Sequence, residues 1–79
     1  MEFVWILVLA IWYFMTITNN VKKHREERKL TQDELAQAVG VSRQTICAME
    51  RGNYEPSLGL ALKLSGFFKV KVEDLFMLR

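Results

Sequence analysis

The sequence predicts an all-α fold, a compact domain of five short helices behind an apolar N-terminal segment. Fifteen of the first 18 residues are apolar, whereas the remaining 61 residues hold 25, an ordinary proportion for a folded domain. After residue 19, glycines and one proline divide the chain into segments of about ten residues. Their apolar spacing is helical throughout, and no stretch alternates long enough to predict a strand. We therefore expect an extension over residues 1–18 and a folded domain over residues 19–79.

The composition excludes several classes of protein. With 79 residues the chain is too short for a nucleotide-fold or barrel enzyme, which needs roughly 150–250 residues. The single cysteine cannot form an intrachain disulfide, and one cysteine with one histidine cannot supply the four ligands of a structural zinc site. His24 has no nucleophilic serine or cysteine at an activating spacing. We predict that the protein is not an enzyme and has no metal site and no cofactor.

The first helix of the domain is predicted over residues 20–29, with Asn19 or Asn20 as its cap. It carries five basic and two acidic residues and little apolar surface beyond Val21 and Leu30. Such a short helix is barely stable alone, so packing or ion pairs must hold it. His24 stands on its inward side and is expected to be partly buried.

The next two helices form a helix-turn-helix outline. Thr31 and Glu34 have the spacing of a capping box, and Gly40 stands where a helix-ending glycine is expected. Ser42 then caps a helix over residues 43–50. The expected inward apolar side chains are Leu35, Ala36, Val39, Ile46 and Met49.

Two further helices complete the predicted domain. Pro56–Ser57 begins a helix that runs to about Phe68, and residues 72–76 form a short last helix. Gly59 and Gly66 each weaken the longer helix by up to about 1 kcal/mol, so it is either looser than the rest or braced by another residue. The expected inward side chains here are Leu58, Ala61, Leu62, Leu64, Leu75 and Phe76.

The run TQDELAQAVGVSRQTICAMERG, residues 31–52, resembles the helix-turn-helix of the phage repressor/Cro-like (XRE) family of transcription regulators. The resemblance extends from about Asn20 to Phe76. It implies a lambda-repressor-like bundle of five helices. It also implies a sequence-specific regulator that binds double-stranded DNA in a prokaryotic cytoplasm and acts as a homodimer. Because no sensor domain is evident, we expect no small-molecule effector.

In a helix-turn-helix protein the second helix of the motif enters the major groove with its N-terminal residues toward the bases. Arginine can pair with guanine and glutamine with adenine through two hydrogen bonds each, and a small alanine can contact a thymine methyl. The expected base contacts are therefore Ser42, Arg43, Gln44, Thr45 and Ala48.

The resemblance also implies phosphate contacts and an ion pair. The expected phosphate contacts are Gln32, Arg51, Asn53 and Tyr54, and Gln32 is further expected to brace Gln44. Arg25 and Glu50 match positions that form a structural ion pair in the family. The basic residues Lys22, Lys23, Arg28 and Lys29 are interpreted as a solvated face, and Cys47 as a small packed or half-exposed residue.

The family resemblance does not cover residues 1–18, for which three interpretations stay open. The first is a strand or helix that dimerises the protein through Phe3, Val4, Trp5, Ile6, Leu7 and Val8. The second is a membrane anchor over residues 3–17, which is short for a bilayer span of about 20 residues but is followed by basic residues. The third is translation from Met15. A signal peptide fits badly, because a basic start and a cleavage site are lacking.

The leading hypothesis is a homodimeric transcriptional regulator that binds DNA. Two alternatives belong to other classes. One is an antitoxin whose main partner is a toxin protein, and the other is a regulator tethered to a membrane by residues 3–17.

Overall fold

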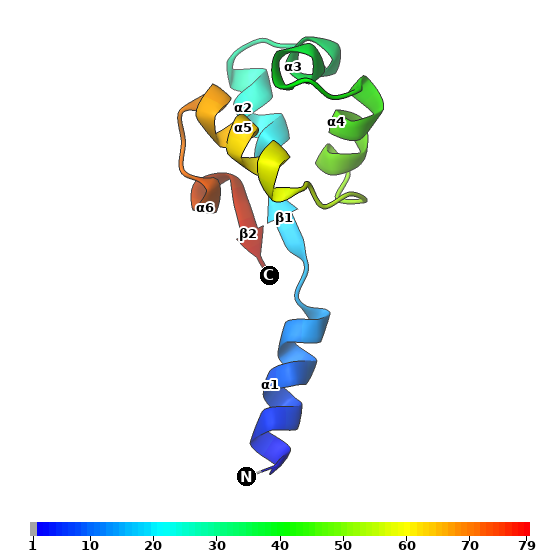
Figure 1. The fold of residues 1–79 in the computed structure, drawn as a ribbon, viewed down its shortest axis with the longest axis vertical. Coiled ribbons are helices and arrows are strands. Elements are labelled where there is room, and N and C mark those ends of the chain that lie inside the picture. The colour runs from blue at the N-terminus through cyan, green and yellow to red at the C-terminus, as the bar shows by residue number, and fades with distance from the viewer. Residues whose placement is uncertain (1) are drawn as a thin grey trace.

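The structure is a computed structural model that describes residues 2–79, apart from the side chain of Phe14. Six helices and two short strands follow one another along this part of the chain (Figure 1). They are α1 (Glu2–Phe14), β1 (Ile17–Asn19), α2 (Val21–Glu27), α3 (Gln32–Val39), α4 (Arg43–Glu50), α5 (Leu58–Phe68), α6 (Val72–Leu75) and β2 (Phe76–Leu78).

The domain is formed by α2 to α6 around one apolar core. Each of these helices is short, so its stability comes from the apolar side chains that it buries against its neighbours. The predicted inward residues of α3 and α4 are all buried, and Leu75 is buried while Phe76 packs at the edge of the core. The buried core comprises Val21, Leu35, Ala36, Val39, Ile46, Met49, Leu60, Leu64, Phe68 and Leu75.

The prediction that the chain is helical throughout was wrong at both ends of the domain. β1 and β2 pair antiparallel, with Ile17 opposite Leu78 and Asn19 opposite Phe76. Thr16 and Arg79 extend the pairing through two backbone hydrogen bonds of 2.8 and 2.9 Å. Strands of three residues are too short to show an alternating pattern in the sequence. Because β1 spans residues 17–19, the expected boundary between residues 18 and 19 falls inside a paired strand.

The predicted helix ends around the turn have the expected chemistry. The Thr31 hydroxyl accepts from the Glu34 backbone N–H at 3.0 Å, and the Thr31 N–H donates to the Glu34 carboxylate at 2.9 Å. Both hydrogen bonds hold the pKa of Glu34 below its usual value, and the bond from the Thr31 backbone has the larger effect. Gly40 ends α3 in the left-handed conformation, with φ 77°, and Ser42 caps α4.

The inward face of α5 differs from the prediction. The helix buries Leu60, Ala61, Leu64 and Phe68, which follow one another at helical spacing on one side. Leu58 and Leu62 were expected in the core but lie on the other side, where they are 74% and 55% exposed. The two faces are both apolar, so composition alone could not tell which one faces the core.

The brace expected for α5 comes from Arg28, which was interpreted as part of a solvated face. The helix ends at Lys69 in the left-handed conformation, and its last carbonyl groups need donors. The Arg28 guanidinium donates to the carbonyl oxygens of Phe67 and Phe68 and lies 5.2 Å from the centre of the Phe68 ring. His24, half-buried as predicted, packs its ring against the same phenyl group at 5.5 Å.

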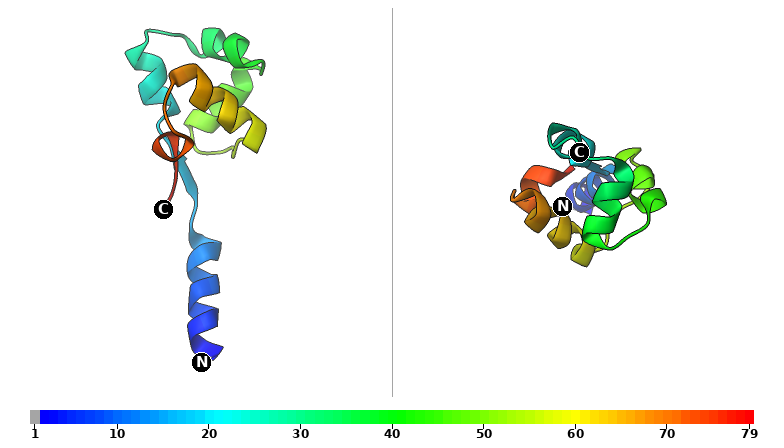
Figure 2. Two further views of the ribbon diagram at one scale, coloured as in Figure 1. Left: turned by 60° about the vertical axis from the view of Figure 1, so that its left-hand side comes forward. Right: turned by 90° about the horizontal axis from the view of Figure 1, so that it is seen from above.

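The N-terminal segment is a helix, α1, that projects away from the domain (Figures 1 and 2). Its large apolar side chains from Phe3 to Tyr13 are between 37% and 83% exposed. Met1 of the predicted extension, and the Phe14 side chain of the predicted dimerisation or anchor segment, lie outside the described residues. Within residues 2–79, no helix has both the length and the apolar character needed to cross a bilayer.

Two glycines allow a matched test of the turn. Gly40→Ala places a side chain on a residue with φ 77°, and no atom lies within 4 Å of the added carbon, so the cost is conformational alone. We expect this substitution to lower the free energy of unfolding by about 1–2 kcal/mol. Gly66→Ala, inside α5 and equally uncrowded, should raise it by about 0.5–1 kcal/mol. Urea unfolding measures both, and changes of the same sign would contradict the assignment of the turn.

Candidate DNA-binding surface

The surface is formed by α3, the turn after it and α4. Gly40 allows the chain to reverse, and its N–H and that of Val41 both donate to the Ala36 carbonyl group. Ile46 and Met49 then bury one side of α4 against the core. This packing leaves the opposite side of α4 directed away from the domain.

Ser42 and the first turn of α4 carry four of the residues predicted to contact bases, and Ala48, the fifth, lies one turn further along the helix. Ser42, Arg43 and Gln44 are exposed, while Thr45 and Ala48 are half-buried. The Ser42 hydroxyl accepts from the Thr45 N–H at 3.2 Å and lies 3.0 Å from the Thr45 hydroxyl, so these two side chains fix each other. Within the described residues, no hydrogen bond holds the side chains of Arg43 and Gln44. Their donors and acceptors are therefore available to a ligand.

The other end of α4 is fixed by Glu50. Its carboxylate accepts from Arg25 Nε at 2.8 Å and from Arg25 Nη2 at 3.1 Å, a two-point ion pair. The side chains are only 12% and 4% exposed, and the Glu50 hydrogen bond raises the pKa of Arg25. Arg25 also donates to the Leu30 carbonyl oxygen at 2.7 Å. One charged pair thus joins α2 to the end of α4.

Gln32 was predicted to brace Gln44, but its side chain belongs to the Arg25–Glu50 cluster instead. Its side-chain NH₂ group donates to Glu50 Oε1 at 3.1 Å. The reason is geometric, because the first turn of α3 faces the last turn of α4 and Gln44 belongs to the first turn. The second N–H of the Gln32 amide remains available to donate to a phosphate oxygen.

Asn19 also holds α4, a role for which the sequence offered no signal. It was considered only as a helix cap. Its side-chain NH₂ group donates to the Met49 carbonyl oxygen at 2.9 Å, and its carbonyl oxygen accepts from the Val21 N–H at 3.1 Å. The last turn of α4 is therefore attached to β1 as well as to α2 and α3.

The loop after α4 carries the other predicted phosphate contacts. Arg51, Asn53 and Tyr54 are exposed. Backbone hydrogen bonds from Arg51 to Cys47 and from Asn53 to Ala48 order the start of the loop, and Gly52 turns it with φ 84°. These side chains border the same end of α4 as Gln32.

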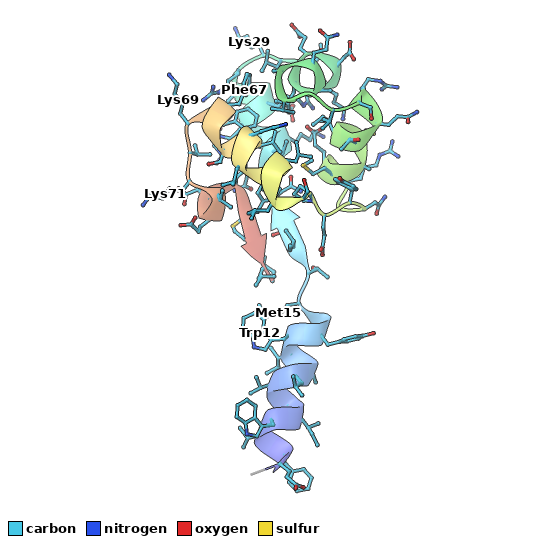
Figure 3. All side chains as sticks on the ribbon, in the orientation of Figure 1. Trp12, Met15, Lys29, Phe67, Lys69 and Lys71 are labelled. Carbon is cyan, nitrogen blue, oxygen red and sulfur yellow. The ribbon has the colours of Figure 1, made fainter. Side chains whose placement is uncertain are left out.

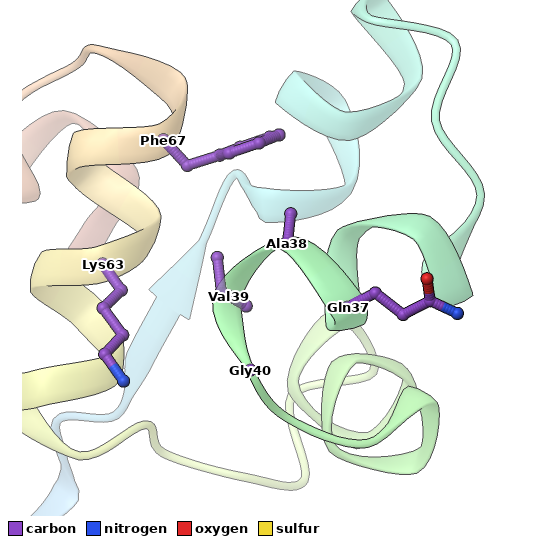
Figure 4. Close-up of a pocket in the computed structure, with 6 residues that line it drawn as sticks. All are labelled: Gln37, Ala38, Val39, Gly40, Lys63 and Phe67. Carbon is purple, nitrogen blue, oxygen red and sulfur yellow. The ribbon is translucent and has the colours of Figure 1, made fainter.

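Other features do not involve the residues predicted to contact DNA. Lys69 and Lys71 are on the side of the domain opposite α4 (Figure 3). A hollow of about 410 Å³ lies between α3 and α5 (Figure 4), lined by Gln37, Ala38, Val39, Gly40, Lys63 and Phe67. In the part of the chain that the structure describes, no three His, Cys, Asp or Glu side chains gather as a metal site would require.

Comparison with known proteins identifies the fold and its class. A family described as helix-turn-helix matches residues 21–75. An uncharacterised HTH-type transcriptional regulator of Methanocaldococcus jannaschii is 54% identical over 59 residues, which cover 75% of this chain and 89% of that protein. The chain belongs to the XRE-type helix-turn-helix family. Members of this family are DNA-binding transcriptional regulators and not enzymes.

Two further relatives of this XRE-type chain support the assignment. The immunity repressor of Bacillus phage phi105 is 38% identical over 58 residues, which cover 73% of this chain and 40% of that protein. The crystal structure of the transcriptional regulator VanUg is similar with a TM-score of 0.67 and 26% identity, covering 82% of this chain and 87% of that one.

The ion pair of this XRE-type domain is the basis of a stability prediction. Arg25→Ala leaves the buried Glu50 carboxylate without its partner, and we expect unfolding to become easier by about 3–5 kcal/mol. Replacing both residues, Arg25→Met with Glu50→Leu, should recover most of this loss because no charge stays buried. Thermal and urea unfolding measure the effect. A single substitution that costs less than about 1 kcal/mol would show that the pair behaves as a surface pair.

Proposed function

We propose that this regulator binds specific sites in double-stranded DNA with the first turn of α4 in the major groove. The observation that carries the proposal is the combination of exposed Arg43 and Gln44 side chains with a buried opposite face of the same helix. A helix fixed in this way presents its N-terminal side chains outward as one rigid unit, which direct readout of bases requires.

Each of the five predicted base contacts has a chemical role in the proposal. Arg43 reads a guanine through its O6 and N7 atoms, and Gln44 reads an adenine through N6 and N7. Ser42 and Thr45 offer hydroxyl groups to bases or phosphates, and Ala48 contacts a thymine methyl. The mutual hydrogen bond of Ser42 and Thr45 keeps the beginning of the helix in place.

Four polar residues around both ends of the motif are proposed to contact phosphates. Such contacts position the protein and supply affinity without reading sequence. Gln32 does this at the start of α3, where the helix dipole favours an anion. Arg51, Asn53 and Tyr54 do so from the exposed loop after α4.

The proposed active form is a cytoplasmic homodimer joined through α1. The side chains of Phe3 to Val8 are exposed although all of them are apolar, which is the property of a surface that another chain covers. A two-fold dimer would place two recognition helices on the two halves of a palindromic site. The antitoxin and membrane-tethered alternatives receive no support from the relatives, whose names describe regulators and repressors.

The base contacts can be tested by binding to DNA from upstream of the regulator's own gene. Arg43→Ala and Gln44→Ala should each weaken specific binding by about 1–3 kcal/mol and relax the choice of base at one position. Lys63→Ala, an exposed change on α5, is the control. Fluorescence anisotropy with the specific site and with scrambled DNA measures the difference. Equal losses on both DNAs would contradict base readout.

The phosphate contacts have a different signature. Arg51→Ala should weaken binding to specific and scrambled DNA alike, and the slope of log K against log salt should become shallower by about 1. Lys71→Ala removes the same charge on the far side of the domain and should leave the slope unchanged. A loss of specificity without a change of slope would show that Arg51 reads bases.

A further inference from the structure

The outer face of α5 carries large apolar side chains that the described residues leave exposed. Leu58 and Leu62 are four residues apart, so they lie together on one face of the helix. They are 74% and 55% exposed, while Leu60 and Leu64 on the inner face are buried. We refer to Leu58 and Leu62 as the outer α5 patch.

The patch begins at Leu58, the first residue of α5, and the position of this end of the helix relative to the N-terminal arm, α1, can be followed in the figures. In both side views the N-terminal end of α5 lies toward β1, and β1 leads directly to α1 (Figures 1 and 2). The arm itself points away from its own domain, with its N-terminus at the far end. Its first residues therefore lie far from the outer α5 patch of their own chain.

The arm needs more than one covering surface. From Phe3 to Tyr13 every side chain is apolar, so α1 has no polar face that could remain in water. Packing against one partner helix buries a single stripe of such a helix. A second α1 alone would leave the opposite side of each helix exposed.

The exposed area is sufficient for a stable dimer. Ten large apolar side chains of α1, including both tryptophans, are exposed to more than a third of their surface. Together they offer roughly 1,000 Å² for each chain, and a standard interface buries about 800 Å² for each partner. A second copy of this chain supplies the same area and the matching patch on α5.

We propose that α1 of one copy packs antiparallel against α1 of a second copy and that its N-terminal half, Phe3 to Leu7, covers the outer α5 patch of that copy. The antiparallel arrangement carries each N-terminus toward the partner domain. By two-fold symmetry both patches are covered, so the assembly stops at a dimer and does not grow further. This inference rests on the proposed homodimer and adds the surface of the domain that receives the arm.

The tryptophans provide a direct readout. The chain has two, Trp5 and Trp12, and both lie in α1, so tryptophan emission reports only on the arm. We expect the emission of the full chain to be blue-shifted as for buried indole. Leu58→Gln with Leu62→Gln should shift it to the red, although these residues are more than 40 positions away. Lys63→Gln is the matched control, since it changes an exposed residue of the same helix and should leave the emission unchanged.

Cysteine pairing shows whether α1 contacts α5 of the second copy or α5 of its own chain. The experiment uses a Cys47→Ser background. One chain carries Leu7→Cys and the other Leu62→Cys, and the two are mixed and mildly oxidised. A mixed disulfide dimer is expected, because the bond forms only where the two Cα atoms come within about 7 Å. If only a chain with both substitutions closes, and does so as a monomer, the arm folds onto its own domain and the proposal is overturned.

The oligomeric mass, measured by light scattering, separates this proposal from the homodimer itself. A dimer that survives the Leu58→Gln/Leu62→Gln change with unaltered emission would overturn the α5 contact and keep the dimer. A monomeric full chain would overturn both. In the last measurement, vesicles of phosphatidylcholine and phosphatidylglycerol are added to the protein. A blue shift that appears only on their addition would assign α1 to a lipid surface and overturn the proposal.

Discussion

The Glu50 carboxylate is the point on which the arrangement of the domain depends. It accepts three hydrogen bonds, two from Arg25 on α2 and one from Gln32 on α3, and it belongs to the last turn of α4. These helices have seven or eight residues each, too few to be stable alone. One nearly buried charge therefore fixes three marginal helices relative to one another. Asn19 adds the strand β1 to the same end of α4.

At the other end of α4, the side-chain hydrogen bonds of the described residues join Ser42 and Thr45 to each other and reach no other helix or strand. The helix is held at its C-terminal end and along its buried side, and its N-terminal turn is ordered locally by Ser42 and Thr45. The rigidity needed for recognition and the exposure needed for contact are thus separated along a single helix. A protein of this size has room for both because the structural contacts lie at one end.

The helix-turn-helix could be predicted from the sequence because local chemistry fixes it. The Thr31–Glu34 capping box, Gly40 and the Ser42 cap each act within a few residues, and the structure contains all three. The strand pair could not be predicted, because it joins residues about 60 positions apart through backbone groups alone. The same holds for Arg28 and Asn19, whose side chains reach backbone carbonyl groups distant in sequence. The predicted buried face of α5 was wrong for another reason. Both faces of this helix are apolar, and only tertiary packing determines which one is buried.

The attachment of β1 has a mechanical consequence. The strand follows α1 in the chain and ends at Asn19. The Asn19 side chain donates a hydrogen bond to the carbonyl group of Met49 in the last turn of α4. β1 is also clamped against β2, so it cannot pivot freely. A force or rotation applied to the arm is therefore transmitted along a short, stiff strand to the base of α4. Asn19 is therefore the residue through which a displacement of the arm would act on the last turn of α4.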